Sequence, residues 1–358
     1  MAAAQSFKEA IAVTPLSSHT YATILRPEWC IGTVPHGGYV TSLFHNVAVA
    51  HLQHTHPTLH SGAPHPITLH LTFLRRTDAG PATFVVQDTK LGSRTSTLHI
   101  SLSQHDPDGG VREEVAGYIT VSNFDEEEGP TMKTGYELFP KPAPGSKPDQ
   151  TLDLAKLARD GHDGDWERFH ISFSAMRKAS HHVEFYTPRH TKAAPGPDAA
   201  QRKGPSGFVE QWVRFKPYGK ISRWTDSTLG YLVDMFPMML ERFDTKPWDD
   251  ASAAAAAKSK NELSTYWYPT VLLNIEFKKK LPAEGVEWLY SRVQTKLLKN
   301  GRMDLDLVVL DEKGEIVALS NHVSLIVSAQ RNVGPRKGKG NGNGNGNGNG
   351  NGNGGSKI

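Results

Sequence analysis

Two segments of the chain alternate apolar and polar residues with the two-residue period of a half-buried β-strand. They cover residues 67–73 and 271–277, and each ends at a phenylalanine that is followed by basic residues. After each segment the chain passes through a turn containing Pro and Gly and enters further strand-like stretches. The apolar positions are Ile67, Leu69, Leu71 and Phe73 in the first strand and Val271, Leu273, Ile275 and Phe277 in the second. This recurrence predicts two copies of one antiparallel unit.

Both copies continue in the same order. A Gly-Arg turn precedes one strand, and a tight turn then leads to a final strand. The turns are Gly92-Ser93-Arg94 and Gly301-Arg302, the strands after them cover residues 97–102 and 303–310, and the final strands cover residues 115–121 and 316–327. We expect two more strands, at residues 182–186 and 208–215, to open the second copy.

A helical segment precedes the main strands of each copy. In the first copy, apolar residues follow the spacing of one helix face directly after His36-Gly37-Gly38. In the second copy, Asp226-Ser227 can cap a helix that runs through Asp234 to Leu240, and we expect a kink at Pro237. One helix and one antiparallel sheet in each copy predict an α+β fold.

Composition changes divide the chain into four parts. We place the N-terminal unit at residues 1–124, a linker rich in Pro, Gly and charge at residues 125–180, and the C-terminal unit at residues 181–333. The remaining residues, 334–358, hold 11 of the 33 glycines, mostly in an Asn-Gly repeat. We expect this tail to be disordered, because it has almost no apolar side chains that could offset the loss of backbone entropy.

Charge and hydropathy exclude several classes of protein. The 40 Lys and Arg residues nearly balance the 37 Asp and Glu residues, so we expect no nucleic-acid partner. The most apolar stretch, residues 231–240, is too short to span a bilayer, and the N-terminus lacks the apolar core of a signal peptide. The single cysteine, Cys30, has apolar neighbours, which favour a packed thiol over a catalytic nucleophile.

Several segments together carry a resemblance to a known family. They are residues 32–39, residues 65–74, Gly92-Ser93-Arg94, Val183-Glu184-Phe185, residues 230–237 and residues 317–322. In order and spacing they resemble the type II acyl-CoA thioesterases and the related thioesterase-like double-hotdog proteins. The resemblance implies a double hotdog, in which two antiparallel sheets each wrap around a long central helix. It also implies hydrolysis of an acyl-CoA to the free acid and coenzyme A.

The resemblance also implies catalytic residues. In this family an Asp of the second helix, a Ser or Thr and a Gln from nearby strands activate the water that attacks the thioester. Carried over residue by residue, these positions fall on Asp234, Asn274 and His322. Asn274 can hold a water through its amide but has no hydroxyl, whereas His322 can orient a water or act as a base. This scheme requires no metal or organic cofactor.

The residues themselves support these three positions to different degrees. Asp234 is the one charge within residues 230–240 and must find partners there, unless it faces solvent or only caps the helix. Asn274 lies on the strand face opposite the apolar residues, which without the resemblance is the exposed face. His322 shares its strand face with two serines, and a surface or hydrogen-bonded structural histidine is the alternative there.

The start of the first helix is expected to bind the substrate. The resemblance makes His36, Gly37, Gly38 and Tyr39 candidate substrate-binding residues. Free amides at a helix N-terminus can stabilise the negative charge that develops on a thioester oxygen. Alternatively, the two glycines only permit a turn and close packing of the helix. The basic strand ends at Arg75, Arg76 and residues 278–280 are weaker candidates for contacting the coenzyme A phosphates.

A dense run of histidines raises the question of a metal site. The run consists of His45, His51, His54, His56, His60 and His65. Its spacing matches no zinc-binding motif and no cysteine supports it, so we predict no metal site from it.

Two alternatives to hydrolysis remain at this level. A non-catalytic acyl-thioester binding protein would keep the pocket while altering the catalytic positions. A hotdog enoyl-CoA hydratase or dehydratase is disfavoured, because the Asp-x-Asn-Pro-x-His pattern of hydratases does not occur.

The end of the tail resembles a targeting signal. It ends in Ser356-Lys357-Ile358, one residue different from the peroxisomal signal Ser-Lys-Leu. We therefore expect binding to the peroxisomal import receptor and a peroxisomal location, with the cytoplasm as the alternative. The oligomeric state stays open, from a monomer to a homo-tetramer, because the two copies already supply the two-hotdog unit within one chain.

Overall fold

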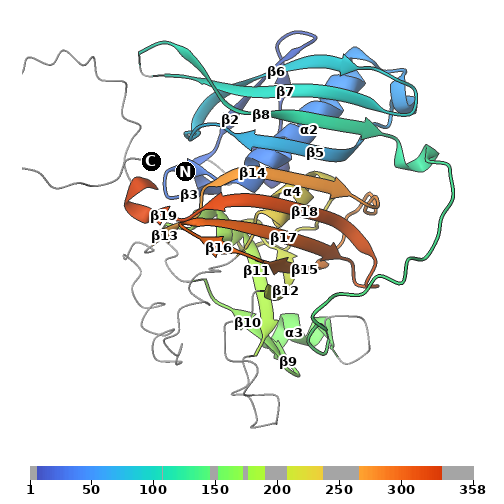
Figure 1. The fold of residues 1–358 in the computed structure, drawn as a ribbon, viewed down its shortest axis with the longest axis vertical. Coiled ribbons are helices and arrows are strands. Elements are labelled where there is room, and N and C mark those ends of the chain that lie inside the picture. The colour runs from blue at the N-terminus through green and yellow to red at the C-terminus, as the bar shows by residue number, and fades with distance from the viewer. Residues whose placement is uncertain are drawn as a thin grey trace, which may run out of the picture.

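The structure, a computed structural model, describes residues 6–106, 108–145, 152–171, 176–189, 208–236 and 266–332. Most of its strands form one continuous antiparallel sheet (Figure 1). Across this sheet the first half of the chain supplies, in order, β2 (Thr20–Leu25), β6 (Gly80–Lys90), β7 (Ser96–His105), β8 (Val111–Ser122) and β5 (His65–Phe73). The second half follows with β14 (Thr270–Phe277), β18 (Ile316–Leu325), β17 (Arg302–Leu310), β15 (Trp288–Gln294) and β12 (Phe208–Phe215).

The two halves are copies related by a pseudo-twofold axis between β5 and β14. The strand order of the second half is the reverse of the first, as such an axis requires. At the junction, Leu71 lies opposite Leu273 and Leu69 opposite Ile275, and all four side chains are buried. The alternation that predicts the two strands thus also forms the seam between the halves. The predicted α+β double hotdog is confirmed, with its two sheets joined into one.

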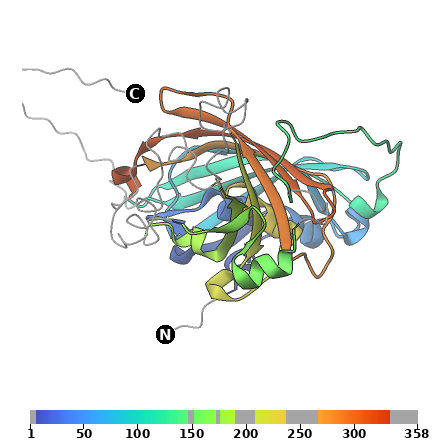
Figure 2. The ribbon, with the colours of Figure 1, turned by 90° about the horizontal axis from the view of Figure 1, so that it is seen from below.

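Two helices, α2 (Gly37–Thr55) and α4 (Asp226–Val233), lie inside the curve of this sheet (Figure 2). They touch backbone to backbone where each carries a glycine. A Cβ added to Gly38 would lie 2.6 Å from the Gly230 carbonyl oxygen, and one added to Gly230 would lie 2.9 Å from the Thr41 methyl group. Glycine is therefore needed at both positions. The contact brings the N-terminus of α2 against the C-terminus of α4.

The central helix α2 is buried on nearly all sides, because the sheet wraps around it and α4 covers part of what remains. Its inward residues include Val40, Leu43, Phe44, Val47 and Ala48, the apolar stripe expected from the sequence. Across the part of the chain that the structure describes, no helix has both the length and the apolar character needed to cross a membrane.

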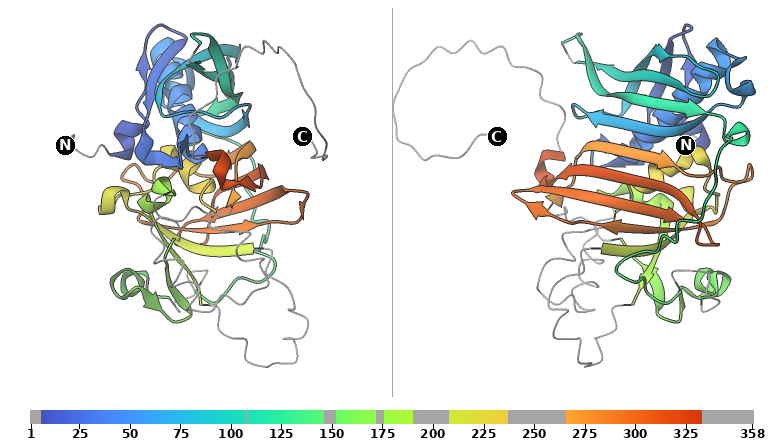
Figure 3. Two further views of the ribbon diagram at one scale, coloured as in Figure 1. Left: turned by 90° about the vertical axis from the view of Figure 1, so that its left-hand side faces the viewer. Right: turned by 45° about the vertical axis from the view of Figure 1, so that its right-hand side comes forward.

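The predicted linker contains regular structure. It includes α3 (Leu154–Asp160), β9 (His162–Asp163) and β10 (Trp166–Phe169), and β10 pairs with β11 (Val183–Pro188). The sheet of the second half therefore extends into the segment that the sequence analysis called a linker (Figure 3). The reason is an apolar outer face of the second sheet, which needs a cover. Leu138 and Leu157 from the linker pack there with Trp166, Trp212, Trp288 and other aromatic residues.

The second helix is shorter than predicted. α4 ends at Val233, and Asp234 is its C-cap. The kink predicted at Pro237 lies outside the described residues, as do the tail at residues 334–358 and its final tripeptide.

Candidate active site

A cavity of about 420 Å³ lies where the N-terminus of α2, the C-terminus of α4 and the start of β14 meet. Its walls are mostly apolar and aromatic. They include Ile31, Val34, Phe73, Met176, Phe185, Met235, Phe236, Trp267 and Tyr268. His36, Gly37, Asp234 and Thr270 also line it and are among its polar groups. A cavity of this size with apolar walls and a few converging polar groups is typical of a small-molecule site.

Asp234 supplies the carboxylate of the cavity and is almost fully buried. Its Oδ2 accepts a hydrogen bond from the Gly38 amide at 2.7 Å, and its Oδ1 accepts one from the Thr270 hydroxyl at 3.1 Å. These donors compensate the carboxylate for the water it loses on burial. The predicted partners of Asp234 therefore exist, and they come from α2 and β14.

The two glycines at the start of α2 make room for this carboxylate. A Cβ on Gly37 would lie 2.7 Å from Asp234 Oδ2, and a Cβ on Gly38 would lie 2.8 Å from Asp234 Cβ. Gly37 lines the cavity, whereas the amide of Gly38 is already bonded to Asp234. Of the two predicted oxyanion candidates, only Gly37 thus lines the cavity, and Gly38 instead donates its amide to the carboxylate.

Thr270 reaches the cavity because β14 is irregular at its start. The pairing of β14 with β18 shifts register between Thr270 and Leu272, so one extra residue interrupts the alternation there. Strict alternation would place Thr270 on the outer face with Asn274, whereas its hydroxyl in fact donates inward to Asp234. Sequence analysis missed Thr270 for this reason, since a bulge leaves no clear mark in the apolar pattern.

His322 lies behind Asp234, with its Nδ1 3.7 Å from Asp234 Oδ1. Its Nε2 lies 2.9 Å from the Ser320 hydroxyl, whose own proton goes to the Asn274 carbonyl. Ser320 must therefore accept from His322, and this assigns the ring proton to Nε2 and leaves a lone pair on Nδ1. Burial lowers the pKa of His322 to about 4, so the imidazole is neutral near pH 7.

His36 approaches the same carboxylate from the other side. It precedes α2, and its Nε2 lies 3.1 Å from the Asp234 carbonyl oxygen and 3.5 Å from Asp234 Oδ2. Burial lowers the pKa of His36, although the neighbouring Asp234 opposes this shift. A neutral His36 that donates from Nε2 links the N-terminus of α2 to the C-cap of α4.

Asn274 and Tyr39, two predicted site residues, lie elsewhere. Asn274 faces outward on the sheet, where its Oδ1 is 3.0 Å from His70 Nδ1 and its Nδ2 donates to Asn321. Asn274 thus lies on the face that the alternation indicates and away from the cavity. The hydroxyl that reaches the cavity belongs to Thr270, four residues earlier in the strand. Tyr39 is directed into the core, where its hydroxyl donates to the Ala10 carbonyl at 2.8 Å.

Two family sequence models match this chain. The acyl-CoA thioesterase N-terminal domain matches residues 25–122, and the acyl-CoA thioesterase C-terminal domain matches residues 149–326. The chain belongs to the acyl-CoA thioesterase family. It is a thioester hydrolase, as the resemblance predicted.

Individual relatives agree with this acyl-CoA thioesterase assignment. The thioesterase-like protein TwmA of Talaromyces wortmannii is 34% identical, with 93% of this chain and 95% of TwmA covered. A hot dog protein of unknown function from Alicyclobacillus acidocaldarius superposes with a TM-score of 0.60 at 14% identity, covering 90% of this chain and 98% of that one. Acyl-CoA thioesterase II TesB2 from Mycobacterium marinum gives 0.53 at 16% identity, with 90% and 98% covered. At such identities the two structures show the fold.

The basic strand ends of this thioesterase divide into two groups. Arg75 and Arg76 line the cavity, and Arg75 is exposed. Lys279 instead pairs with Asp311 and Glu315, and the flanking lysines 278 and 280 also form ion pairs away from the cavity. Only the first group is placed to meet a ligand that enters the cavity.

Proposed function

We propose that Asp234 is the general base of this thioesterase and that Thr270 holds the attacking water beside it. The observation that carries this proposal is that both side chains line one cavity and are hydrogen-bonded to each other at 3.1 Å. Because the Thr270 proton is donated to Asp234, its oxygen lone pairs are left to accept from a water molecule. That water can then give its second proton to the carboxylate.

The reaction balances with these groups alone. The water oxygen forms a bond to the thioester carbonyl carbon while Asp234 takes the water proton. The carbonyl oxygen becomes an oxyanion, which the amide of Gly37 at the start of α2 is placed to stabilise. The bond from carbon to sulfur then breaks, the thiolate of coenzyme A takes the proton from Asp234, and the free acid remains.

His322 and His36 act as positioning residues in this scheme. The lone pair on His322 Nδ1 faces Asp234 Oδ1, so it can accept a hydrogen bond from the carboxyl group once that group is protonated. His36 holds the backbone of Asp234 through its carbonyl oxygen. Neither ring needs to change its charge during the reaction.

The cavity walls support an apolar acyl group as the substrate. Phe73, Phe185, Phe236 and Tyr268 offer aromatic surface, and the burial of each methylene group of a fatty acyl chain there contributes about 0.8 kcal/mol. Arg75 is exposed at the cavity and can meet a phosphate of coenzyme A. We therefore propose a fatty acyl-CoA as the substrate and lipid metabolism as the setting.

Release of thiol from a panel of acyl-CoAs of increasing chain length tests this function. A chromogenic thiol reagent reports turnover, and a fluorescence titration with the same acyl-CoAs reports binding. We expect turnover that rises with chain length until the acyl chain fills the cavity. Tight binding without thiol release across the whole panel would favour the non-catalytic binding protein.

Localisation is a separate proposal. The tripeptide Ser356-Lys357-Ile358 lies outside the described residues, and its similarity to Ser-Lys-Leu supports recognition by the peroxisomal import receptor. A fluorescent reporter extended by residues 334–358 tests this proposal. Punctate fluorescence that coincides with a peroxisomal marker is expected, and diffuse cytosolic fluorescence would contradict it.

A further inference from the structure

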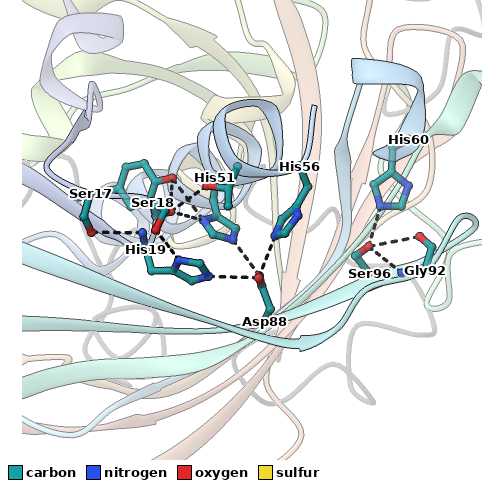
Figure 4. Close-up of polar contacts among 11 residues, drawn as sticks. Ser17, Ser18, His19, His51, His56, His60, Asp88, Gly92 and Ser96 are labelled. Atoms are coloured by element: carbon teal, nitrogen blue, oxygen red, sulfur yellow. Dashed lines mark hydrogen bonds and ion pairs between the residues drawn. The ribbon is translucent and has the colours of Figure 1, made fainter. Parts of the chain in front are cut away.

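A second cluster of polar side chains lies at the C-terminal end of α2, opposite the end that lines the cavity. Three imidazoles converge there on the carboxylate of Asp88, which lies on β6 (Figure 4). His51 Nε2 is 2.8 Å from Asp88 Oδ1, while His19 Nε2 and His56 Nε2 are 3.1 Å and 2.8 Å from Asp88 Oδ2. The four residues come from three separate segments: His19 precedes β2, His51 and His56 belong to α2 and its C-cap, and Asp88 lies on β6.

We propose that this cluster is a structural zinc site in which His19, His51 and Asp88 are ligands and His56 completes the coordination. The donor atoms of His19, His51 and Asp88 all lie within 4.8 Å of one another. In tetrahedral zinc with bonds of 2.0 to 2.1 Å, the donor atoms are about 3.4 Å apart, so small rotations of the side chains suffice. Imidazole nitrogens with one carboxylate oxygen form a donor set that suits zinc.

The Nδ1 atoms of His19 and His51 have oxygen partners, as the second ring nitrogen of a metal-binding histidine usually does. His51 Nδ1 lies 3.1 Å from the Ser18 carbonyl oxygen and 3.2 Å from the Tyr21 hydroxyl. His19 Nδ1 lies 2.9 Å from the Ser18 hydroxyl. Oxygen partners at Nδ1 fix the ring orientation and leave the Nε2 lone pair for a metal ion. Ser18 and Tyr21 thus supply an outer shell for the ligands.

In one of its two neutral tautomers, His51 favours an ion over a simple hydrogen bond. If His51 donates from Nδ1 to the Ser18 carbonyl, its Nε2 carries a lone pair that faces a carboxylate oxygen at 2.8 Å. Two acceptors at this distance need a cation between them or a second proton on the ring. The His51 side chain has no exposed surface, which disfavours a charged ring and favours an ion that carries the charge.

The site would be structural, because it is far from the cavity. α2 has 19 residues between His36 and His56, and at 1.5 Å per residue these ends are about 28 Å apart. An ion there would tie the C-terminal end of the central helix to β6 and to the segment before β2. The histidine run gave no such indication in the sequence, because two of the four residues, His19 and Asp88, lie outside the run.

Metal content and zinc affinity of the full chain test the proposal, with any histidine tag removed beforehand. Elemental analysis by mass spectrometry gives the zinc content as purified. After chelation, a titration with Zn²⁺ against a chromogenic chelator gives the affinity. The test variants are Asp88→Asn and His19→Gln, which preserve side-chain size. His54→Gln is the matched control, because His54 lies on the same helix but is exposed.

We expect one zinc per chain in the wild type and in His54→Gln. We expect binding at least about a hundredfold weaker in Asp88→Asn and His19→Gln, the upper range seen when only an outer-shell partner is lost. Circular dichroism of all four proteins checks that each is folded. Zinc affinity that is equal in wild type and both test variants, or a wild type that binds no Zn²⁺, would overturn the proposal and make the cluster a hydrogen-bonded network around Asp88.

Discussion

The exchange Asp234→Asn tests the catalytic proposal most directly. It replaces one carboxylate oxygen by an amide nitrogen of nearly the same size, so the packing against Gly37 and Gly38 stays as it is. The remaining amide oxygen can still accept the Gly38 amide, and the Thr270 hydroxyl can turn to accept from the new NH₂ group. The change therefore removes the proton acceptor and keeps the shape of the site.

The size of the effect follows from these contacts. Loss of a general base lowers kcat by about a hundredfold to ten-thousandfold, which corresponds to about 2.7 to 5.5 kcal/mol of transition-state stabilisation. Hydrogen bonds to charged groups contribute about 1.5 to 3 kcal/mol to stability, and the amide retains part of this. We expect folded protein with nearly unchanged acyl-CoA binding and a large loss of turnover.

Thiol release from an acyl-CoA under saturating conditions measures this loss. Asp226→Asn is the matched control, because Asp226 is another aspartate of the α4 region that accepts a backbone hydrogen bond, from Leu281 at 2.9 Å, outside the cavity. Its kcat should stay within about twofold of wild type. A folded Asp234→Asn enzyme that keeps more than a tenth of the wild-type kcat would refute Asp234 as the general base.

Three further predictions follow from the structure. Thr270→Val should lower kcat roughly ten- to a hundredfold in the thiol-release assay, because it loses a hydrogen bond to a charged group. Thr270→Ser keeps the hydroxyl and should keep most of the activity. Equal rates for the two variants would contradict this. Gly38→Ala should lower the free energy of unfolding in urea by about 1 to 3 kcal/mol, since its Cβ would press on the α4 backbone, and an unchanged midpoint would speak against that contact. Burial lowers the pKa of His45, His182 and His322 to about 4. In the unfolded chain these histidines bind protons near pH 6.5, so their full contribution to stability is present above that pH and is lost as the pH falls toward 4. At pH 5 we expect the free energy of unfolding to be lower by roughly 2 kcal/mol per group. Urea midpoints that match at pH 7 and pH 5 would exclude this.

The fold could be predicted because its signals are repeated and regular. The alternation in residues 67–73 recurs in residues 271–277, and both strands formed as β5 and β14. The apolar stripe after His36-Gly37-Gly38 likewise became α2. The linker was predicted less well. Its cover over the second sheet depends on aromatic residues that are distant in sequence, such as Trp166 and Trp212, and no local pattern joins them.

The candidate site could be predicted where a residue stands out from its neighbours. Asp234 does so as a single charge in an apolar segment, and His322 does so on a polar face that the structure turns inward. Thr270 could not be found in this way, because a bulge reverses its direction. The same limit applies to the cluster around Asp88, whose members meet only after the sheet has brought β6 to the end of α2.

The repeat raises the question of why the two halves do not form two equivalent sites, and the sheet register answers it. Gly38 lies against Asp234 as Gly230 lies against Ser42, so Ser42 and Asp234 correspond. In a sequence alignment of β5 with β14, Phe73 is equivalent to Phe277, and the same alignment makes Pro66 equivalent to Thr270. In the sheet, Ile119 lies opposite Leu69 and His322 lies opposite the equivalent Leu273, so Ile119 and His322 also correspond. The second half therefore has an aspartate, a threonine and a histidine where the first half has a serine, a proline and an isoleucine. A serine hydroxyl, a proline ring and an aliphatic side chain supply no carboxylate, so they cannot activate water as proposed for Asp234. Among the described residues the proposed centre thus occurs once, and the first half contributes to it through His36, Gly37 and Gly38 at the start of α2.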